Sequence, residues 1–144
     1  MAAITTKEFL ARLNAGEKDF SSLDLRGIDL SKRDLRQLNF RNAILSDANL
    51  EKADLRFSDL QGANLARANL TDTDLYRGKL MQAYLEGVSL IRTKFLGADL
   101  SGAVLKDAIL QDTNFFYARM PDRTLRLGRV SYVALMQTQY PGLF

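Results

Sequence analysis

Leucine or phenylalanine occupies every fifth position of this 144-residue chain from Phe20 to Phe115. The run contains twenty consecutive positions, sixteen of them leucine and four phenylalanine. A five-residue period matches neither an α-helix, with about 3.6 residues per turn, nor a flat strand, in which successive side chains alternate. So strict a period over about a hundred residues indicates a repeat architecture in which each unit packs on its neighbours.

The residues around each Leu/Phe position also repeat. The position two residues earlier is small in most repeats, as at Ala48 and Ala63, and the position just before the Leu/Phe is Asp or Asn in thirteen of the twenty repeats. Two inward side chains separated by one outward side chain are typical of a short strand. The repeat therefore predicts a strand of about three residues followed by a corner.

Glycine marks where the chain turns. Five of the nine glycines stand two residues after the Leu/Phe position, where a type II turn requires a positive φ. Asn and Asp, which tolerate that φ, occupy the slot in other repeats. Lys52, Phe57 and Arg77 share the slot without that tolerance, so we expect their corners to use another turn type. If four repeats closed a square coil, the twenty repeats would give about five coils.

Consecutive repeats read A-(D/N)-L-x-x, as in ANLEK at 48–52. Over roughly residues 16–120 the chain resembles the pentapeptide-repeat family. That resemblance implies an all-β solenoid in the form of a right-handed quadrilateral β-helix. We therefore expect one domain over 1–144, made of an N-terminal cap at 1–15, the solenoid at 16–120 and a C-terminal cap at 121–144.

The segment before the repeats is expected to close the end of the solenoid with a short helix. Residues 5–8 (TTKE) fit a capping box, an apolar stripe runs from Phe9 to Leu13, and a glycine follows. We expect a helix over roughly 6–14 on the first coil. Arg33 stands at an inward slot of that coil, and we expect it to point out of the end of the column.

After Phe115 the repeat pattern decays. The chain's two prolines, Pro121 and Pro141, both follow it. We expect 121–144 to form an irregular cap, with a short helix near 131–138 as one alternative. The tail is too apolar to be free, so it either covers the last coil or takes part in a dimer contact. The chain is accordingly expected to be a monomer or a C-terminally mediated homodimer.

The composition argues against catalysis and metal binding. The chain has no histidine and no cysteine, which removes Ser-His-Asp and Cys-His nucleophilic sites and most transition-metal sites. Asp34, Asp54 and Asp74 should stack on one face, but a convex column has no cleft for an acid–base pair. We expect such carboxylates to bond backbone amides at the corners. No catalytic residue, cofactor or metal is therefore predicted.

Charge and hydropathy suggest a soluble protein. The net charge is +3, with 20 basic and 17 acidic residues interspersed, which is typical of a solvated surface. No apolar run approaches the ~20 residues of a membrane span, and no signal peptide is visible. We expect a cytoplasmic protein without membrane contact.

Positions twenty apart should stack, and one face then collects arginines and large apolar side chains. Its candidate protein-binding residues are Arg36, Arg56, Phe57, Tyr76, Arg77, Leu96, Phe116 and Tyr117. Tyr, Phe and Arg are enriched at protein interfaces. Alternatively, these side chains merely pack along the stack and stabilise the face. The inward slot of this face carries Thr73, Thr93 and Thr113, an expected threonine ladder.

A second outward column is a weaker candidate for binding. It runs Asp24, Ile44, Asn64, Tyr84 and Val104, and its three apolar members replace the usual Asp or Asn.

These observations favour a non-enzymatic protein-interaction module, a rigid rod presenting one face to a protein partner. The family resemblance also implies an alternative, a DNA-mimicking modulator of a type II topoisomerase. Mimicry of DNA requires a strongly negative surface, which the net charge of +3 disfavours. Direct nucleic-acid binding through Arg36, Arg56 and Arg77 is the third hypothesis. The neighbouring column of aspartates would repel phosphates, so a nucleic-acid partner is not expected.

Overall fold

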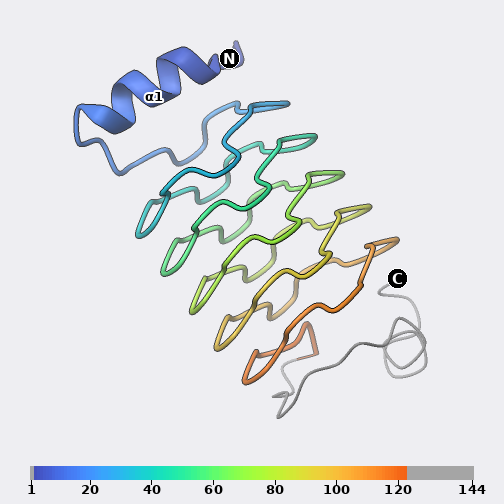
Figure 1. Cartoon of the computed structure of the whole chain (residues 1–144). Helices are drawn as coiled ribbons and strands as arrows, with labels where there is room; N and C mark the ends of the chain where they lie inside the picture. Colours follow the sequence, from blue (N-terminus) through green and yellow to red (C-terminus); the bar gives the residue numbers. More distant parts are fainter. Residues whose placement is uncertain (1, 123–144) are drawn as a thin grey trace.

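The computed structural model describes residues 2–122. Its main body is a column of stacked coils, with helix α1 lying across the N-terminal end (Figure 1). Residues beyond Asp122 lie outside the described part of the chain. The expectations of a C-terminal cap, of an alternative helix near 131–138 and of a dimer contact fall on those residues.

Successive coils are related by a shift of twenty residues. Parallel bridges join Asp19 to Asn39, Asp24 to Ile44, and so on along the column as far as Arg119. Every bridge pairs a residue with the one twenty positions later, and the bridges fall into four ladders five residues apart. Because twenty residues contain four pentapeptides, each coil has four sides, as the resemblance to the pentapeptide-repeat family implies.

Three backbone hydrogen bonds join each side of one coil to the next. On one side they are Leu50 N–H to Asn69 C=O (2.8 Å), Lys52 N–H to Thr71 C=O (2.9 Å) and Asn69 N–H to Ala48 C=O (2.9 Å). Only one residue per side forms a bridge, rather than the three-residue strand that the pattern predicts. The difference arises because the residues before and after each bridge residue belong to the corners.

All corners share a positive φ at the same position. Every corner residue from Ser22 to Tyr117 has a positive φ. The expectation of another turn type at Lys52, Phe57 and Arg77 is wrong, since their φ values are 58°, 60° and 52°. Each of these N–H groups bonds to the next coil, as in Phe57 N–H to Tyr76 C=O at 2.9 Å. Stacking between coils therefore imposes the left-handed conformation even on side chains that do not favour it.

The Leu/Phe side chains fill the axis of the column. All twenty, from Phe20 to Phe115, are buried, and most small residues two positions earlier are buried with them. Thr73, Thr93 and Thr113 also point inward, as expected. Their hydroxyl groups do not bond one another. Each donates at 2.7 Å to a backbone carbonyl of the preceding coil, those of Leu50, Leu70 and Leu90 respectively.

Helix α1 spans Thr6–Asn14 and begins with the predicted capping box, in which Thr5 and Glu8 bond each other's backbone N–H. Phe9 is fully buried and lies on the first coil. The chain before α1 also pairs with the column, because Ile4 N–H donates to Asp24 C=O at 2.9 Å. Arg33 is exposed at this end of the column, as expected.

Candidate protein-binding face

One side of the column, built from the repeats centred on Leu35, Leu55, Leu75, Phe95 and Phe115, carries the predicted binding residues. We call it the arginine–aromatic face. Residues just before and just after each corner bend point outward here, because the inward directions belong to the Leu/Phe and the small residue. All eight candidates are therefore at least partly exposed. None belongs to the buried core.

Paired charges dominate the N-terminal half of this face. Arg36 donates from Nε and Nη2 to the Asp34 carboxylate at 2.8 and 2.7 Å, and Arg56 donates likewise to Asp54 at 2.8 and 2.6 Å. Arg36 also lies 3.7 Å from Asp54. The hydrogen bonds from Arg36 lower the pKa of Asp34 to about 2, and those from Arg56 lower the pKa of Asp54. These two arginines are therefore largely neutralised.

Aromatic side chains dominate the rest of the face, in two groups. Phe57 and Tyr76 pack edge to face with ring centroids 5.3 Å apart, and the Arg77 guanidinium lies 5.6 Å from the Tyr76 ring centroid. Further along, Phe116 and Tyr117 pack edge to face at 4.3 Å. The half-buried Leu96 stands between the two groups in the same column as Tyr76.

The rings remain open to solvent although they pack on each other. Phe57 is 46% exposed and Tyr117 is 52% exposed. The alternative that these side chains pack along the stack is therefore met for Phe57 and Tyr76, which lie on successive coils, whereas Phe116 and Tyr117 are neighbours within one coil. Packing leaves half of each outer ring in water, where apolar area gains nothing from burial.

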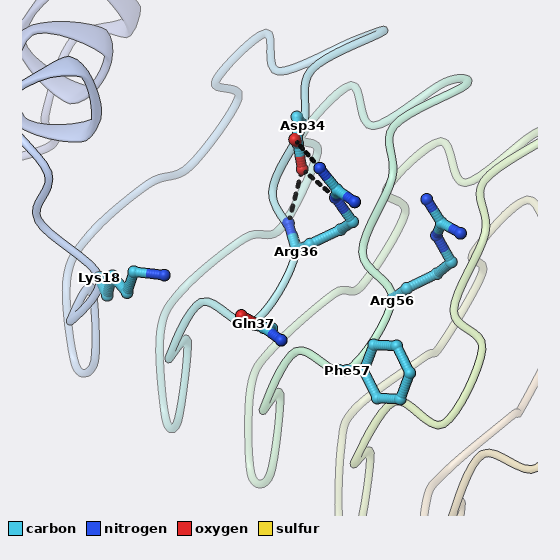
Figure 2. Close-up of a pocket in the computed structure, with 6 residues that line it drawn as sticks. All are labelled: Lys18, Asp34, Arg36, Gln37, Arg56 and Phe57. Carbon is cyan, nitrogen blue, oxygen red and sulfur yellow. Dashed lines mark hydrogen bonds and ion pairs between the residues drawn. The ribbon is translucent and has the colours of Figure 1, made fainter.

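A hollow of about 320 Å³ lies at the N-terminal end of the face. Its lining residues are Lys18, Asp34, Arg36, Gln37, Arg56 and Phe57. Figure 2 shows Lys18 extending from the start of the first coil, with Arg36 and Arg56 on successive coils opposite it. Sequence reasoning missed Lys18 because that residue belongs to the adjacent side of the column. In the sequence, Lys18 stands out only because its long side chain occupies a position that holds a small residue in most later repeats.

The aspartates of this face act on the backbone. Asp34, Asp54 and Asp74 accept the N–H of the residue two positions later at 3.2, 3.2 and 3.0 Å, as predicted. The same bond is made by all thirteen Asp and Asn residues in this slot. Within residues 2–122, no group of three or more acidic side chains is placed to hold a metal ion.

The second candidate column lies on another side of the column and is also exposed. Ile44, Tyr84 and Val104 all show more than a third of their surface, with Tyr84 at 55%. Tyr84 bridges both Asn64 and Val104, so these side chains stack directly. They make no ring contact of the kind seen between Phe57 and Tyr76.

Comparison with known proteins gives the family. A family model described as pentapeptide repeats matches residues 24–56, 48–87 and 83–120, with eight copies of the repeat. The chain belongs to the pentapeptide-repeat family. Proteins of this family form right-handed quadrilateral β-helices, which agrees with the four-sided coils of this pentapeptide-repeat protein.

Two solved structures illustrate the similarity. A pentapeptide-repeat protein from the Arabidopsis thaliana thylakoid lumen is 36% identical, with a TM-score of 0.64 and coverage of 66% of each chain. HetL of the cyanobacterium Nostoc sp. strain PCC 7120 is 29% identical, with a TM-score of 0.53 and coverage of 83% of this chain and 55% of HetL. The match thus spans less than two thirds of HetL and about two thirds of the plant protein.

A search of curated proteins found no match to this pentapeptide-repeat protein. Within the described residues, α1 is the one helix, and neither its length nor its composition would allow it to cross a membrane.

Proposed function

We propose that this pentapeptide-repeat protein is a non-enzymatic interaction module that binds a protein partner through the arginine–aromatic face. The observation that carries the proposal is the pair of half-exposed rings, Phe57 and Tyr117, which lie three coils apart on one side of a rigid column. Aromatic and arginine side chains are the residues that most often dominate binding energy at protein interfaces.

Rigidity and chemistry support this role. The face is fixed by three backbone hydrogen bonds per step, so little conformational entropy is lost when a partner binds. Phe57, Tyr76 and Arg77 form one contiguous cluster, and Phe116 and Tyr117 form another. HetL is involved in regulation of heterocyst differentiation, and a regulatory role of that kind is consistent with a protein that binds another protein.

The test is affinity capture from the source cell with two matched double variants. Phe57→Asn/Tyr117→Asn removes both exposed rings from corner slots, where Asn tolerates the positive φ. The control, Ile44→Asn/Tyr84→Asn, removes two exposed apolar side chains from the second column, where Asn is the usual residue. We expect the face variant to lose a partner that the control retains. Loss in the control alone would assign binding to the second column and contradict the proposal.

The two nucleic-acid hypotheses fit the face less well. DNA mimicry needs uncompensated negative charge, whereas Asp34 and Asp54 are each paired with an arginine. The same ion pairs occupy Arg36 and Arg56, which leaves Arg77 as the arginine of this face without an ion pair among residues 2–122. A supercoiling assay with a type II topoisomerase and salt-dependent DNA binding test these hypotheses, and we expect no effect in either.

The finer architecture belongs to the same proposal. We propose one domain over 1–144 with about five right-handed coils, either monomeric or dimerised through its C-terminal end. We also propose a cytoplasmic location. The plant relative comes from the thylakoid lumen, so cell fractionation of the tagged protein is the test of that location.

A further inference from the structure

The N-terminal edge of the arginine–aromatic face lacks the bonds that join the coils elsewhere. One step further along the column, three bonds are made: Leu35 N–H to Asp54 C=O (2.8 Å), Gln37 N–H to Arg56 C=O (3.1 Å) and Asp54 N–H to Arg33 C=O (2.9 Å). The equivalent groups on the open side are the Asp34 N–H, the Asp34 C=O and the Arg36 C=O. Within residues 2–122, none of the three makes a backbone hydrogen bond. One donor and two acceptors are therefore available in the spacing of a missing strand.

The chain before the repeats covers two other sides of the column at this end. Ile4 N–H donates to Asp24 C=O at 2.9 Å, and Asp29 N–H donates to the Thr6 hydroxyl at 3.3 Å. The edge at Asp19, where the column begins, is open as well; there Lys18 stands between Asp19 and Glu17, which is ion-paired with Arg12. The edge at Asp34 differs because the hollow of about 320 Å³ lies beside it.

Unpaired positive charge surrounds the open edge. Lys18, Lys32 and Arg33 are exposed, and none of them has an ion pair among the described residues. Lys18 lines the hollow (Figure 2), and Arg33 directly precedes the edge. The acidic group at the edge itself, Asp34, is neutralised by Arg36. The hollow is therefore complementary to a negatively charged ligand.

We propose that an extended acidic segment of a protein partner docks in this hollow and adds a strand to the Asp34–Arg36 edge. Two N–H groups of the segment would donate to the Asp34 and Arg36 carbonyls, and one of its carbonyls would accept from the Asp34 N–H. Its acidic side chains would lie near Lys18 and Arg33. Addition of a strand to a free sheet edge is a recurrent mode of peptide recognition. The proposal rests on the proposed function and names the chemistry of the partner at one end of the same face.

A second copy of this chain is disfavoured as the occupant. Charged side chains, lysine above all, at an exposed edge discourage pairing between identical edges. Two copies meeting here would bring Lys18 and Arg33 against the same residues of the other copy. An acidic segment meets the opposite charge and avoids that cost.

The direct test is an NMR titration of the ¹⁵N-labelled full chain with a defined probe. The probe is an acetylated and amidated octapeptide of alternating glutamate and valine. We expect the largest amide shifts at residues 34–37 and about tenfold slower hydrogen exchange at Asp34 N–H on saturation. A peptide of the same sequence, N-methylated at alternate residues, loses its donors and should shift these amides far less. Equal shifts with both peptides, shifts confined to other sides, or no shifts would overturn the proposal.

Charge reversal tests the acidic preference. Lys18→Glu/Arg33→Glu should weaken binding of the probe about tenfold or more, because two attractions become repulsions. The control, Lys7→Glu/Lys106→Glu, makes the same change in net charge at exposed residues away from the edge and should leave the affinity within about twofold. A peptide of alternating lysine and valine should not bind the wild type. An equal loss in both variants would show a net-charge effect and contradict an edge site.

The outcomes separate this proposal from the proposed function. If Lys18→Glu/Arg33→Glu retains a captured partner that Phe57→Asn/Tyr117→Asn loses, the face binds a protein and the edge site is wrong. If the probe binds at 34–37 while Phe57→Asn/Tyr117→Asn captures the same proteins as wild type, the edge site stands and the role of the aromatic cluster is wrong.

Discussion

Phe9 of helix α1 and Phe20 of the first coil pack with ring centroids 4.4 Å apart and ring planes tilted by 37°. Phe40 continues the stack in the next coil, 5.9 Å from Phe20. Phe9 is fully buried and is the one buried residue of α1. A solenoid must cover the open end of its core, and this contact shows how α1 does so: a phenyl ring from the helix takes the place that a preceding coil would fill.

Loss of this ring should destabilise the whole column. We expect Phe9→Ala to lower the free energy of unfolding by about 3–5 kcal/mol, as for other buried phenylalanines. Urea unfolding followed by circular dichroism measures the change. Lys7→Ala, at an exposed position of the same helix, is the control. A loss in Phe9→Ala no larger than in Lys7→Ala would show that α1 is not a cap.

The side chain in the Asp/Asn slot should contribute to stability through its bond to the corner backbone. Asn64 Oδ1 accepts the Ala66 N–H at 3.0 Å, whereas Tyr84, one coil later in the same ladder, cannot offer this bond to the Glu86 N–H. We expect Asn64→Ala to cost about 1 kcal/mol. Tyr84→Asn should be more stable than Tyr84→Ala by a similar amount, because Asn restores the bond. Thermal unfolding of the three variants decides, and equal stability of the two Tyr84 variants would contradict a role for the side-chain bond.

The stability of the fold should depend on how well each corner residue tolerates a positive φ. Lys52 is exposed and has a φ of 58°. Lys52→Asn should stabilise the fold by up to about 1 kcal/mol, and Lys52→Val should destabilise it by about 1–2 kcal/mol, because β-branched side chains tolerate this region least. Chemical unfolding measures both. Equal stability of the Asn and Val variants would show that the corner is not held in the left-handed region.

Acid should weaken the arginine–aromatic face in a defined window. A carboxyl whose pKa is lower in the folded state stabilises that state above its unfolded pKa, and the contribution is lost as the pH falls through the folded pKa. For Asp34 the pKa falls from 3.8 to about 2, so its contribution should disappear between about pH 4 and pH 2. The chain has no histidine, so stability should change little from about pH 5 to pH 8.

Carboxyl NMR titration measures the pKa of Asp34 directly. Arg36→Gln should return this pKa toward 3.8, because the Arg36 side-chain bonds are the largest cause of the shift. Arg77→Gln, on the same face but without an ion pair to Asp34 in the described structure, should leave the pKa of Asp34 unchanged. If the pKa of Asp34 stays at about 2 in Arg36→Gln, the result would contradict the bidentate ion pair.

The fold was largely predictable because each position of the five-residue repeat has the same structural role in every repeat. Regular Leu/Phe spacing fixed which side chains point inward, and the capping box at Thr5 fixed the start of α1. The corners at Lys52, Phe57 and Arg77 were not predictable from intrinsic preference. Their conformation is imposed by hydrogen bonds to the next coil, a tertiary effect that no local sequence preference encodes.

The candidate site was predictable only in part. Stacking at intervals of twenty places Phe57, Arg77 and Tyr117 in one column, and this followed from the five-residue period together with the four-sided coil that the family resemblance implies. The hollow beside Asp34 could not, because it depends on the route by which the chain leaves α1 and enters the first coil at Lys18. Along that route Gly16 has a φ of 90° and Glu17 N–H donates to Arg12 C=O at 3.1 Å, and neither feature belongs to the repeat.

The register of twenty residues is the central claim, and a cysteine-free chain allows a clean test of it. Gln61 and Met81 are twenty residues apart and stacked, since Gly62 N–H donates to Met81 C=O at 2.9 Å. Neighbouring strands lie about 4.8 Å apart, within the range that a disulfide can bridge. We expect Gln61→Cys/Met81→Cys to form an intramolecular disulfide on mild oxidation and Gln61→Cys/Glu86→Cys, displaced by one side of the coil, to remain reduced. Cross-linking of the 61/86 pair in preference to the 61/81 pair would contradict the four-sided coil.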